Sequence, residues 1–153
     1  MQARLNPYQA APDAIKAVLA LEDFVKKSGL EPGLIDLVKT RASQINGCAF
    51  CINMHTREAM ARGETAERLF LLDAWREAPV YSDRERAALA WTESLTRIAD
   101  THAPDDVYAK VRPQFSEEEL VKLTVVIGAI NVWNRIAIGF RSIPEVKGKR
   151  QAA

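Results

Sequence analysis

The sequence predicts an all-α fold of about six or seven helices in a single domain over residues 1–153. Apolar residues recur at helical spacing along the chain, and capping residues mark the helix starts. No segment shows the period-two alternation or the hairpin turn of a β-sheet. Hydrophobic residues make up 48% of the 153 residues and charged residues 27%, which is the composition of a globular chain with a sizeable core. The net charge of +1 provides no strong field for nucleic acid or an acidic membrane, so we expect neither partner.

Residues 1–12 are expected to form an irregular arm, because Pro7 and Pro12 discourage a helix there. This arm is either a frayed terminus or a segment that packs across a neighbouring subunit. After it, Asp13 is a favourable N-cap for a helix over 13–28, which a glycine ends.

Two helices flank a break in the first half of the chain. Pro32-Gly33 turns the chain into a helix over 34–45, and Asn46-Gly47 cannot comfortably continue it. A further helix is expected over 48–62. Asp36, in the first turn of the earlier helix, is either a solvated acid favoured by the helix dipole or part of a functional site.

The second half of the chain is expected to hold four helices. Thr65, Ser82 and Ser116 are N-caps, and the last two begin capping boxes. The helices are expected over 65–76, 82–100, 105–111 and 120–140. The last contains the longest apolar stretch, but polar residues including Asn131 and Asn134 interrupt it. We therefore expect a buried helix and not a membrane span.

The reactive side chains are concentrated in one motif. Cys48 and Cys51 are the only two cysteines, and His55 is one of two histidines. At about 100° per residue all three lie on one face of the helix, with the thiols in its first turn. Helix N–H groups stabilise a thiolate there and lower the thiol pKa, and His55 is close enough to exchange a proton with Cys51. The pattern indicates thiol–disulfide redox chemistry or peroxide reduction.

Three other interpretations compete with redox chemistry. Inert packing would require both cysteines and a histidine to share a face by chance. A structural disulfide would close a loop too short to constrain much of the unfolded chain. Zinc would have three ligands in Cys48, Cys51 and His55, and its fourth would be water or an acid such as Asp36. We favour redox chemistry and expect neither a metal nor a cofactor.

The stretch Arg41–Cys51, followed by Met54-His55, resembles the core of the alkylhydroperoxidase D-like (AhpD-like) family, which is grouped with the carboxymuconolactone decarboxylases. The similarity extends from about Asp36 through Ala90, and the stretch Asn131–Arg135 also resembles the family. The CxxCxxxH spacing after an Asn-Gly break separates the thiol-bearing branch from true decarboxylases. The resemblance implies the AhpD-like helical fold and a homo-oligomer, often a trimer or hexamer.

The resemblance also implies a role for each site residue. Cys51 matches the thiol that attacks the peroxide, Cys48 the thiol that resolves the sulfenic acid, and His55 a member of a proton relay. Helix-end electrostatics alone would make Cys48 the more acidic thiol. Asp36 stands where the family has a glutamate, and the resemblance makes it a catalytic member of the proton relay with His55. Its carboxylate is one methylene shorter than that of the glutamate. Phe50 stands where some members have a histidine.

The expected function is a thiol-dependent peroxidase that reduces hydroperoxides and is regenerated by an external dithiol. The alternatives are a carboxymuconolactone decarboxylase-like lyase and a non-catalytic redox or metal sensor. Asn131, Trp133 and Asn134 are candidates for the substrate pocket, or they hold subunits together by hydrogen bonds. The N-terminus lacks the apolar segment of a signal peptide, so a cytoplasmic protein is expected. The basic tail over 144–153 is expected to be mobile.

Overall fold

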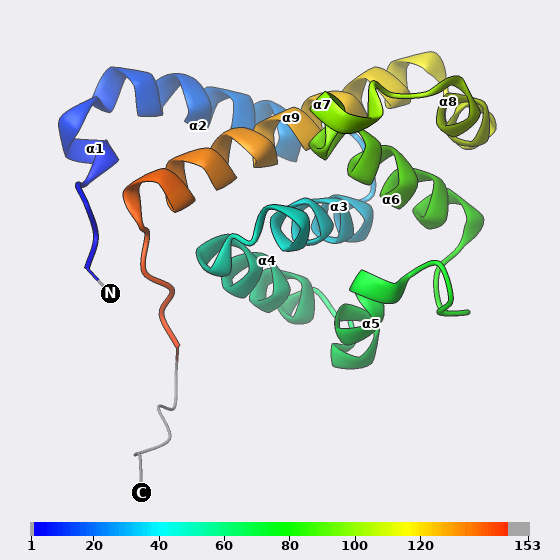
Figure 1. Cartoon of the computed structure of the whole chain (residues 1–153), viewed down its shortest axis with the longest axis horizontal. Helices are drawn as coiled ribbons and strands as arrows, with labels where there is room; N and C mark the ends of the chain where they lie inside the picture. Colours follow the sequence, from blue (N-terminus) through cyan, green and yellow to red (C-terminus); the bar gives the residue numbers. More distant parts are fainter. Residues whose placement is uncertain (1, 147–153) are drawn as a thin grey trace, which may run out of the picture.

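The computed structural model describes residues 2–146, so most of the predicted basic tail, from residue 147 on, lies outside the described residues. Within them the chain forms helices and no strand, which confirms the all-α prediction (Figure 1). The α-helices are α1 (Pro7–Ala10), α2 (Pro12–Lys26), α3 (Pro32–Asn46), α4 (Ala49–Ala61), α5 (Ala66–Leu71), α6 (Asp83–Thr96), α7 (Ile98–Thr101), α8 (Asp105–Val111) and α9 (Glu117–Phe140). Two 3₁₀ helices, η1 (Leu72–Ala74) and η2 (Arg112–Gln114), follow α5 and α8.

The N-terminal arm is more ordered than predicted, because it contains α1. The Asn6 side chain accepts a hydrogen bond of 3.0 Å from the Tyr8 N–H, and Pro7 occupies the first helical position. A proline is tolerated there because the N–H that it lacks would have no partner within the helix. Pro12 likewise opens α2 in place of the predicted cap Asp13.

The later helices begin as predicted and are more subdivided. In both capping boxes the serine hydroxyl accepts the glutamate N–H and the glutamate carboxylate accepts the serine N–H; the pairs are Ser82–Glu85 and Ser116–Glu119. The predicted helix over 65–76 is α5 followed by η1, and the predicted helix over 82–100 is α6 followed by the one-turn α7. The one-turn helices α1 and α7 account for the difference from the six or seven helices expected.

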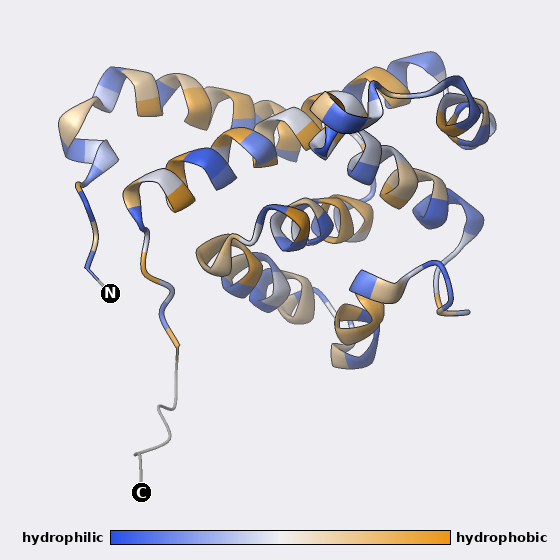
Figure 2. Ribbon diagram, in the orientation of Figure 1, coloured by the Kyte–Doolittle hydropathy of each residue, from blue (hydrophilic) through white to orange (hydrophobic). Residues whose placement is uncertain are grey.

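Helix α3 occupies the centre of the fold and packs against α4, α6 and α9, while α2 packs on α9 (Figure 1). Hydrophobic and polar residues lie side by side along these helices, as expected where each helix buries one face (Figure 2). The buried part of α3 nevertheless includes several polar or charged residues: Asp36, Lys39, Thr40, Arg41 and Ser43. The central helix therefore brings charge into the interior.

By length and composition, α9 is long and apolar enough to cross a membrane. Here it packs against α2, α3, α4 and α6, and it buries Ile127 and Ile130 together with Asn131 and Asn134. These contacts account for its apolar composition, as in the core helix of a helical bundle.

Candidate active site

The reactive motif begins where α3 ends. Gly47 has φ +69°, the left-handed conformation that favours glycine, and its N–H bonds back to the end of α3. Cys48 follows in an extended conformation as the N-cap of α4, and its Sγ accepts the N–H of Cys51 at 3.3 Å. The sequence analysis predicted that Cys48 is the first residue of this helix. It is instead the residue that caps the helix. Its sulfur lies where backbone N–H groups favour a thiolate.

Cys48 and Cys51 form a disulfide, with Cα atoms 5.4 Å apart. Both residues are 1% exposed and pack against Ala42, Ile130 and Ala137 of α3 and α9. The pair thus lies at the junction of α3, α4 and α9, held from three sides.

A cavity of about 420 Å³ opens beside this junction, between α2, α3, α4 and α9. Cys51 and His55 line it, together with apolar side chains such as Phe50, Met54 and Trp133. Cys48 is not among the lining residues. Of the two cysteines, Cys51 is therefore the one that belongs to the cavity wall.

His55 lies in the cavity wall with one ring nitrogen engaged. Its Nδ1 is 3.0 Å from Oε2 of Glu58, and this hydrogen bond holds the pKa of the Glu58 carboxyl below its ordinary value, although burial raises it. Because a carboxylate only accepts hydrogen bonds, Nδ1 carries a hydrogen, and in the neutral ring Nε2 is then the acceptor. His55 Nε2 is buried and has no hydrogen-bond partner among the described residues. The ring is therefore set up to take a proton at Nε2.

Asp36 lines the same cavity, but its partner is Arg62. Arg62 Nε donates to Asp36 Oδ2 at 2.7 Å, and a second guanidinium nitrogen donates to Oδ1. Asp36 is 4% exposed, so it is not the solvated first-turn acid considered above. The carboxylate that contacts His55 directly is that of Glu58.

The sequence analysis missed both Glu58 and Arg62. Their spacing could have indicated them, since Glu58 follows His55 by three residues and Arg62 follows Glu58 by four on the same helix. It also missed a buried ion pair in the cavity wall, between Glu22 of α2 and Lys39 of α3. Glu22 and Lys39 are seventeen residues apart, and no local spacing connects them.

Of the three predicted pocket residues, only Trp133 lines the cavity. The Asn46 side-chain amide donates to Oδ1 of Asn131 at 2.9 Å and of Asn134 at 2.8 Å. Asn134 in turn donates to the Ser43 hydroxyl at 3.0 Å. These amides join α3 to α9 within one chain, so Asn131 and Asn134 have a structural task that accounts for their burial.

No group of three His, Cys, Asp or Glu side chains suited to a metal ion is found within residues 2–146. The disulfide occupies two of the three ligands on which a zinc site would depend.

Comparison with known proteins identifies the family and the fold. Residues 12–94 match the model of the carboxymuconolactone decarboxylase family. The uncharacterized protein YdfG of Bacillus subtilis (strain 168) is 43% identical over 138 residues, which cover 90% of this chain and 94% of YdfG.

Two solved structures share the fold. A protein of unknown function from Agrobacterium tumefaciens, described as a candidate antioxidant defence protein AhpD, superposes with a TM-score of 0.93 at 53% identity, covering 95% of this chain and 100% of that one. An uncharacterized peroxidase-related protein from Ralstonia eutropha JMP134, an alkylhydroperoxidase AhpD core, has a TM-score of 0.79 at 18% identity, covering 90% of this chain and 74% of that one. At that identity, the second likeness shows the fold alone.

Proposed function

The chain is an AhpD-like member of the carboxymuconolactone decarboxylase family, and from that premise we propose that it is a thiol-dependent peroxidase. One observation carries the proposal: Cys51, one half of a CxxC pair, lines a cavity beside a histidine whose Nε2 is unengaged by the described residues. A redox-active sulfur, a base and room for a substrate are the parts that peroxide reduction requires.

In the reduced protein, His55 Nε2 takes the proton from the Cys51 thiol. The thiolate attacks the terminal oxygen of the hydroperoxide, and the O–O bond breaks. The departing oxygen takes the proton from His55 and leaves as an alcohol or water, while Cys51 becomes a sulfenic acid. The peroxide gains two electrons and the sulfur loses two.

Cys48 then resolves the sulfenic acid. The Cys48 thiol loses its proton, its sulfur attacks the Cys51 sulfur, and the S–O bond breaks. The departing oxygen takes that proton and leaves as water while the Cys48–Cys51 disulfide forms. An external dithiol reduces this disulfide by two thiol exchanges and is itself oxidised. The position of Cys48 at the start of α4 stabilises its thiolate as both attacking and leaving group.

Two carboxylates support His55 in this proposal. Glu58 contacts the ring directly and fixes its tautomer and orientation. Arg62 interacts with both carboxylates. It donates hydrogen bonds to Asp36, and its positive charge helps to lower the pKa of Glu58. Asp36 therefore acts on the relay through Arg62.

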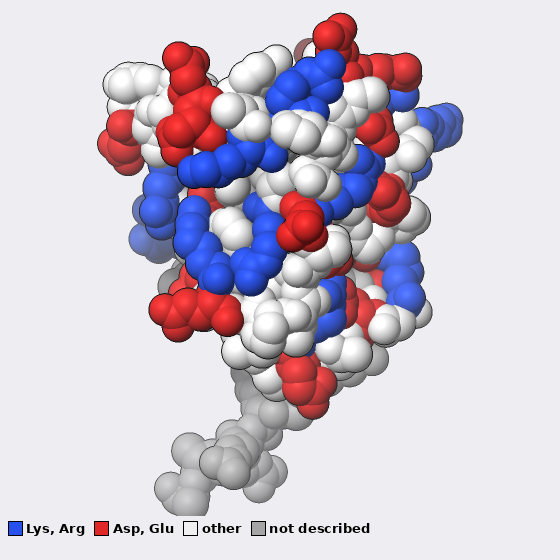
Figure 3. All heavy atoms as spheres, turned by 90° about the vertical axis from the view of Figure 1, so that its right-hand side faces the viewer, with Lys and Arg blue, Asp and Glu red and all other residues white. Residues whose placement is uncertain are grey.

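We further propose a cytoplasmic homo-oligomer, a trimer or hexamer, that binds neither nucleic acid nor membrane. Exposed apolar side chains, including Phe70 at 79% and Val121 at 64%, support assembly. On the face in Figure 3, basic and acidic side chains lie beside one another, which supports the absence of a nucleic-acid surface there.

Thiol titration before and after one equivalent of hydroperoxide tests the function. We expect both thiols to disappear and a dithiol to restore them, and Cys51→Ser to abolish turnover. In Cys48→Ser, a sulfenic acid should be trapped on Cys51, whereas trapping only on Cys48 in Cys51→Ser would reverse the two roles.

The same assay separates the alternatives. Conversion of a lactone without thiol consumption would establish a decarboxylase-like lyase instead. Thiols that peroxide leaves unchanged, together with stoichiometric zinc, would establish a sensor.

A further inference from the structure

The cavity contains a second polar feature that the peroxidase cycle does not use. Lys39 of α3 and Glu22 of α2 form an ion pair in the cavity wall, with side chains that are 6% and 15% exposed. Burying two charges is costly, so such a pair is weak evidence of a purely stabilising role.

Each member of this pair has unused hydrogen-bonding capacity. Glu22 Oε1 accepts from Lys39, but Glu22 Oε2 is buried and has no partner in the described part of the chain. The Lys39 ammonium carries three N–H donors, and among the described residues it donates a hydrogen bond to Glu22 Oε1. The pair therefore offers an acceptor and donors side by side.

The unmet polar atoms are concentrated in this cavity. Among the described residues, three buried side-chain polar atoms lack a hydrogen-bond partner, and two of them, His55 Nε2 and Glu22 Oε2, belong to residues that line it. The wall also includes apolar side chains, such as Leu19, Ile35 and Trp133. Two residues of the cavity wall thus carry a buried acceptor without a partner within residues 2–146, beside an apolar surface.

We propose that Glu22 and Lys39 bind a hydroxyl group of the substrate, so that the preferred substrates are organic hydroperoxides with an apolar body and a hydroxyl remote from the peroxide. A hydroxyl donates one hydrogen bond, to Glu22 Oε2, and accepts one, from Lys39 Nζ. A carboxylate would be repelled by Glu22, and an ammonium would be repelled by Lys39. This assignment rests on the proposed peroxidase function for the reacting end of the substrate only.

Two pairs of probes test the subsite. The hydroperoxides are cumene hydroperoxide and its para-hydroxymethyl derivative. The unreactive counterparts are cumene and para-isopropylbenzyl alcohol, which carry no oxygen at the reacting end, and their binding is measured by titration calorimetry. We expect the hydroxymethyl compound to bind about tenfold tighter, and its kcat/KM to be about tenfold higher through a lower KM.

Glu22→Gln replaces the free acceptor by an amide N–H donor and should reduce both ratios to about one. Glu67→Gln, on an exposed part of α5, is the matched control and should leave both ratios unchanged. Equal binding of the two unreactive compounds by the wild-type protein would overturn the proposal, whether or not the variant folds. Ratios that Glu22→Gln leaves unchanged would overturn it as well.

The two proposals fail separately. Selective binding of the hydroxymethyl alcohol without any peroxide consumption would retain the subsite and refute the peroxidase. Rapid peroxide consumption with no preference for the hydroxymethyl compound would do the reverse.

Discussion

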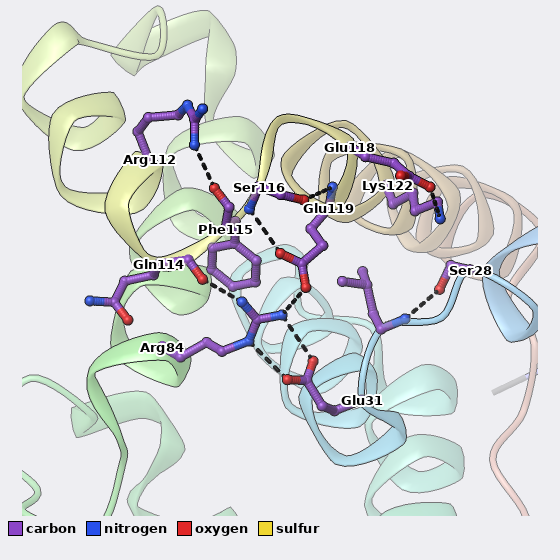
Figure 4. Close-up of polar contacts among 11 residues, drawn as sticks. Ser28, Glu31, Arg84, Arg112, Gln114, Phe115, Ser116, Glu118, Glu119 and Lys122 are labelled. Atoms are coloured by element: carbon purple, nitrogen blue, oxygen red, sulfur yellow. Dashed lines mark hydrogen bonds and ion pairs between the residues drawn. The ribbon is translucent and has the colours of Figure 1, made fainter.

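Two arginine-centred clusters in this molecule use their charge differently. Arg84 at the start of α6 donates to Glu31 at 2.9 and 3.2 Å, to Glu119 at 2.7 Å and to the Gln114 carbonyl (Figure 4). Its guanidinium also lies 4.0 Å above the centre of the Phe115 ring. The cluster joins the starts of α3, α6 and α9, because the Arg84 guanidinium donates hydrogen bonds to Glu31 before α3 and to Glu119 in α9.

The cluster in the cavity also contains an arginine bound to both oxygens of a carboxylate, but one of its polar atoms has no partner in the part of the chain that the structure describes. Arg62 binds both oxygens of Asp36, as Arg84 binds both oxygens of Glu31. The neighbouring His55, however, keeps a buried ring nitrogen without a partner in the described structure. An unmet buried polar atom costs about 1–3 kcal/mol of stability. The difference teaches that fully paired polar groups hold helices together here, while the unpaired polar atom belongs to a residue of the cavity wall.

The largest expected effect comes from removing the base. His55→Asn deletes the nitrogen that accepts the Cys51 proton in the proposed cycle, and general-base catalysis typically contributes about 10²–10⁴-fold. We expect kcat/KM for hydroperoxide to fall by about 10²–10³-fold, measured by peroxide consumption in the presence of a dithiol.

His102→Asn is the matched control, since the other histidine is exposed on a loop, and it should leave the rate unchanged. Glu58→Gln should fall in between, with a loss of about tenfold and a changed pH profile. A His55→Asn variant with wild-type turnover would erase the proposed contrast between the two clusters.

An intermediate effect, on stability and not on activity, is expected from Arg84→Met. Methionine replaces the aliphatic part of the Arg84 side chain but not its guanidinium, so the hydrogen bonds to Glu31 and Glu119 are lost. The expected cost is about 1–3 kcal/mol in the free energy of unfolding. Denaturant titration measures the loss, and peroxide turnover should stay within about twofold. Arg84→Lys should recover only part of the stability, because an ammonium lacks the planar set of donors with which Arg84 binds both oxygens of Glu31. Loss of turnover at full stability would show that the Arg84 cluster serves the reaction.

The smallest expected effect is a difference in acid sensitivity. Burial raises the pKa of Glu31, but hydrogen bonds led by Arg84 more than offset it; for Glu119, hydrogen bonds to Ser116 and then Arg84 lower the pKa. Both folded-state pKa values lie below the ordinary 4.5, so their stabilisation is fully present above that pH and is lost as the pH falls through the folded values.

The wild-type protein should therefore lose stability more steeply than Arg84→Met between about pH 5 and pH 3. Because both carboxylates are partly exposed, the difference in melting temperature should be small, on the order of 1–2 °C. Parallel acid curves for the two proteins would show that the Arg84 pairs contribute nothing measurable.

Much of the fold could be predicted from the sequence because its signals are local. The boxes at Ser82 and Ser116 place two helix starts, since a cap and its partner are three residues apart. The prediction of an irregular N-terminal arm was wrong for a local reason as well. Pro7 and Pro12 were expected to break helices, and instead they begin them. Proline at a first helical position resembles proline in a loop unless the following turn is seen.

What the sequence by itself determined is the all-α fold and the grouping of Cys48, Cys51 and His55, because a single helix fixes side chains within eight residues of one another. Only the tertiary structure decided that Arg62 binds Asp36 and that Glu22 meets Lys39. Those pairs join different helices, and their geometry depends on how α2, α3 and α4 pack. The spacing of residues along one helix is set by its backbone, whereas contacts between helices are set by the packing of the whole core.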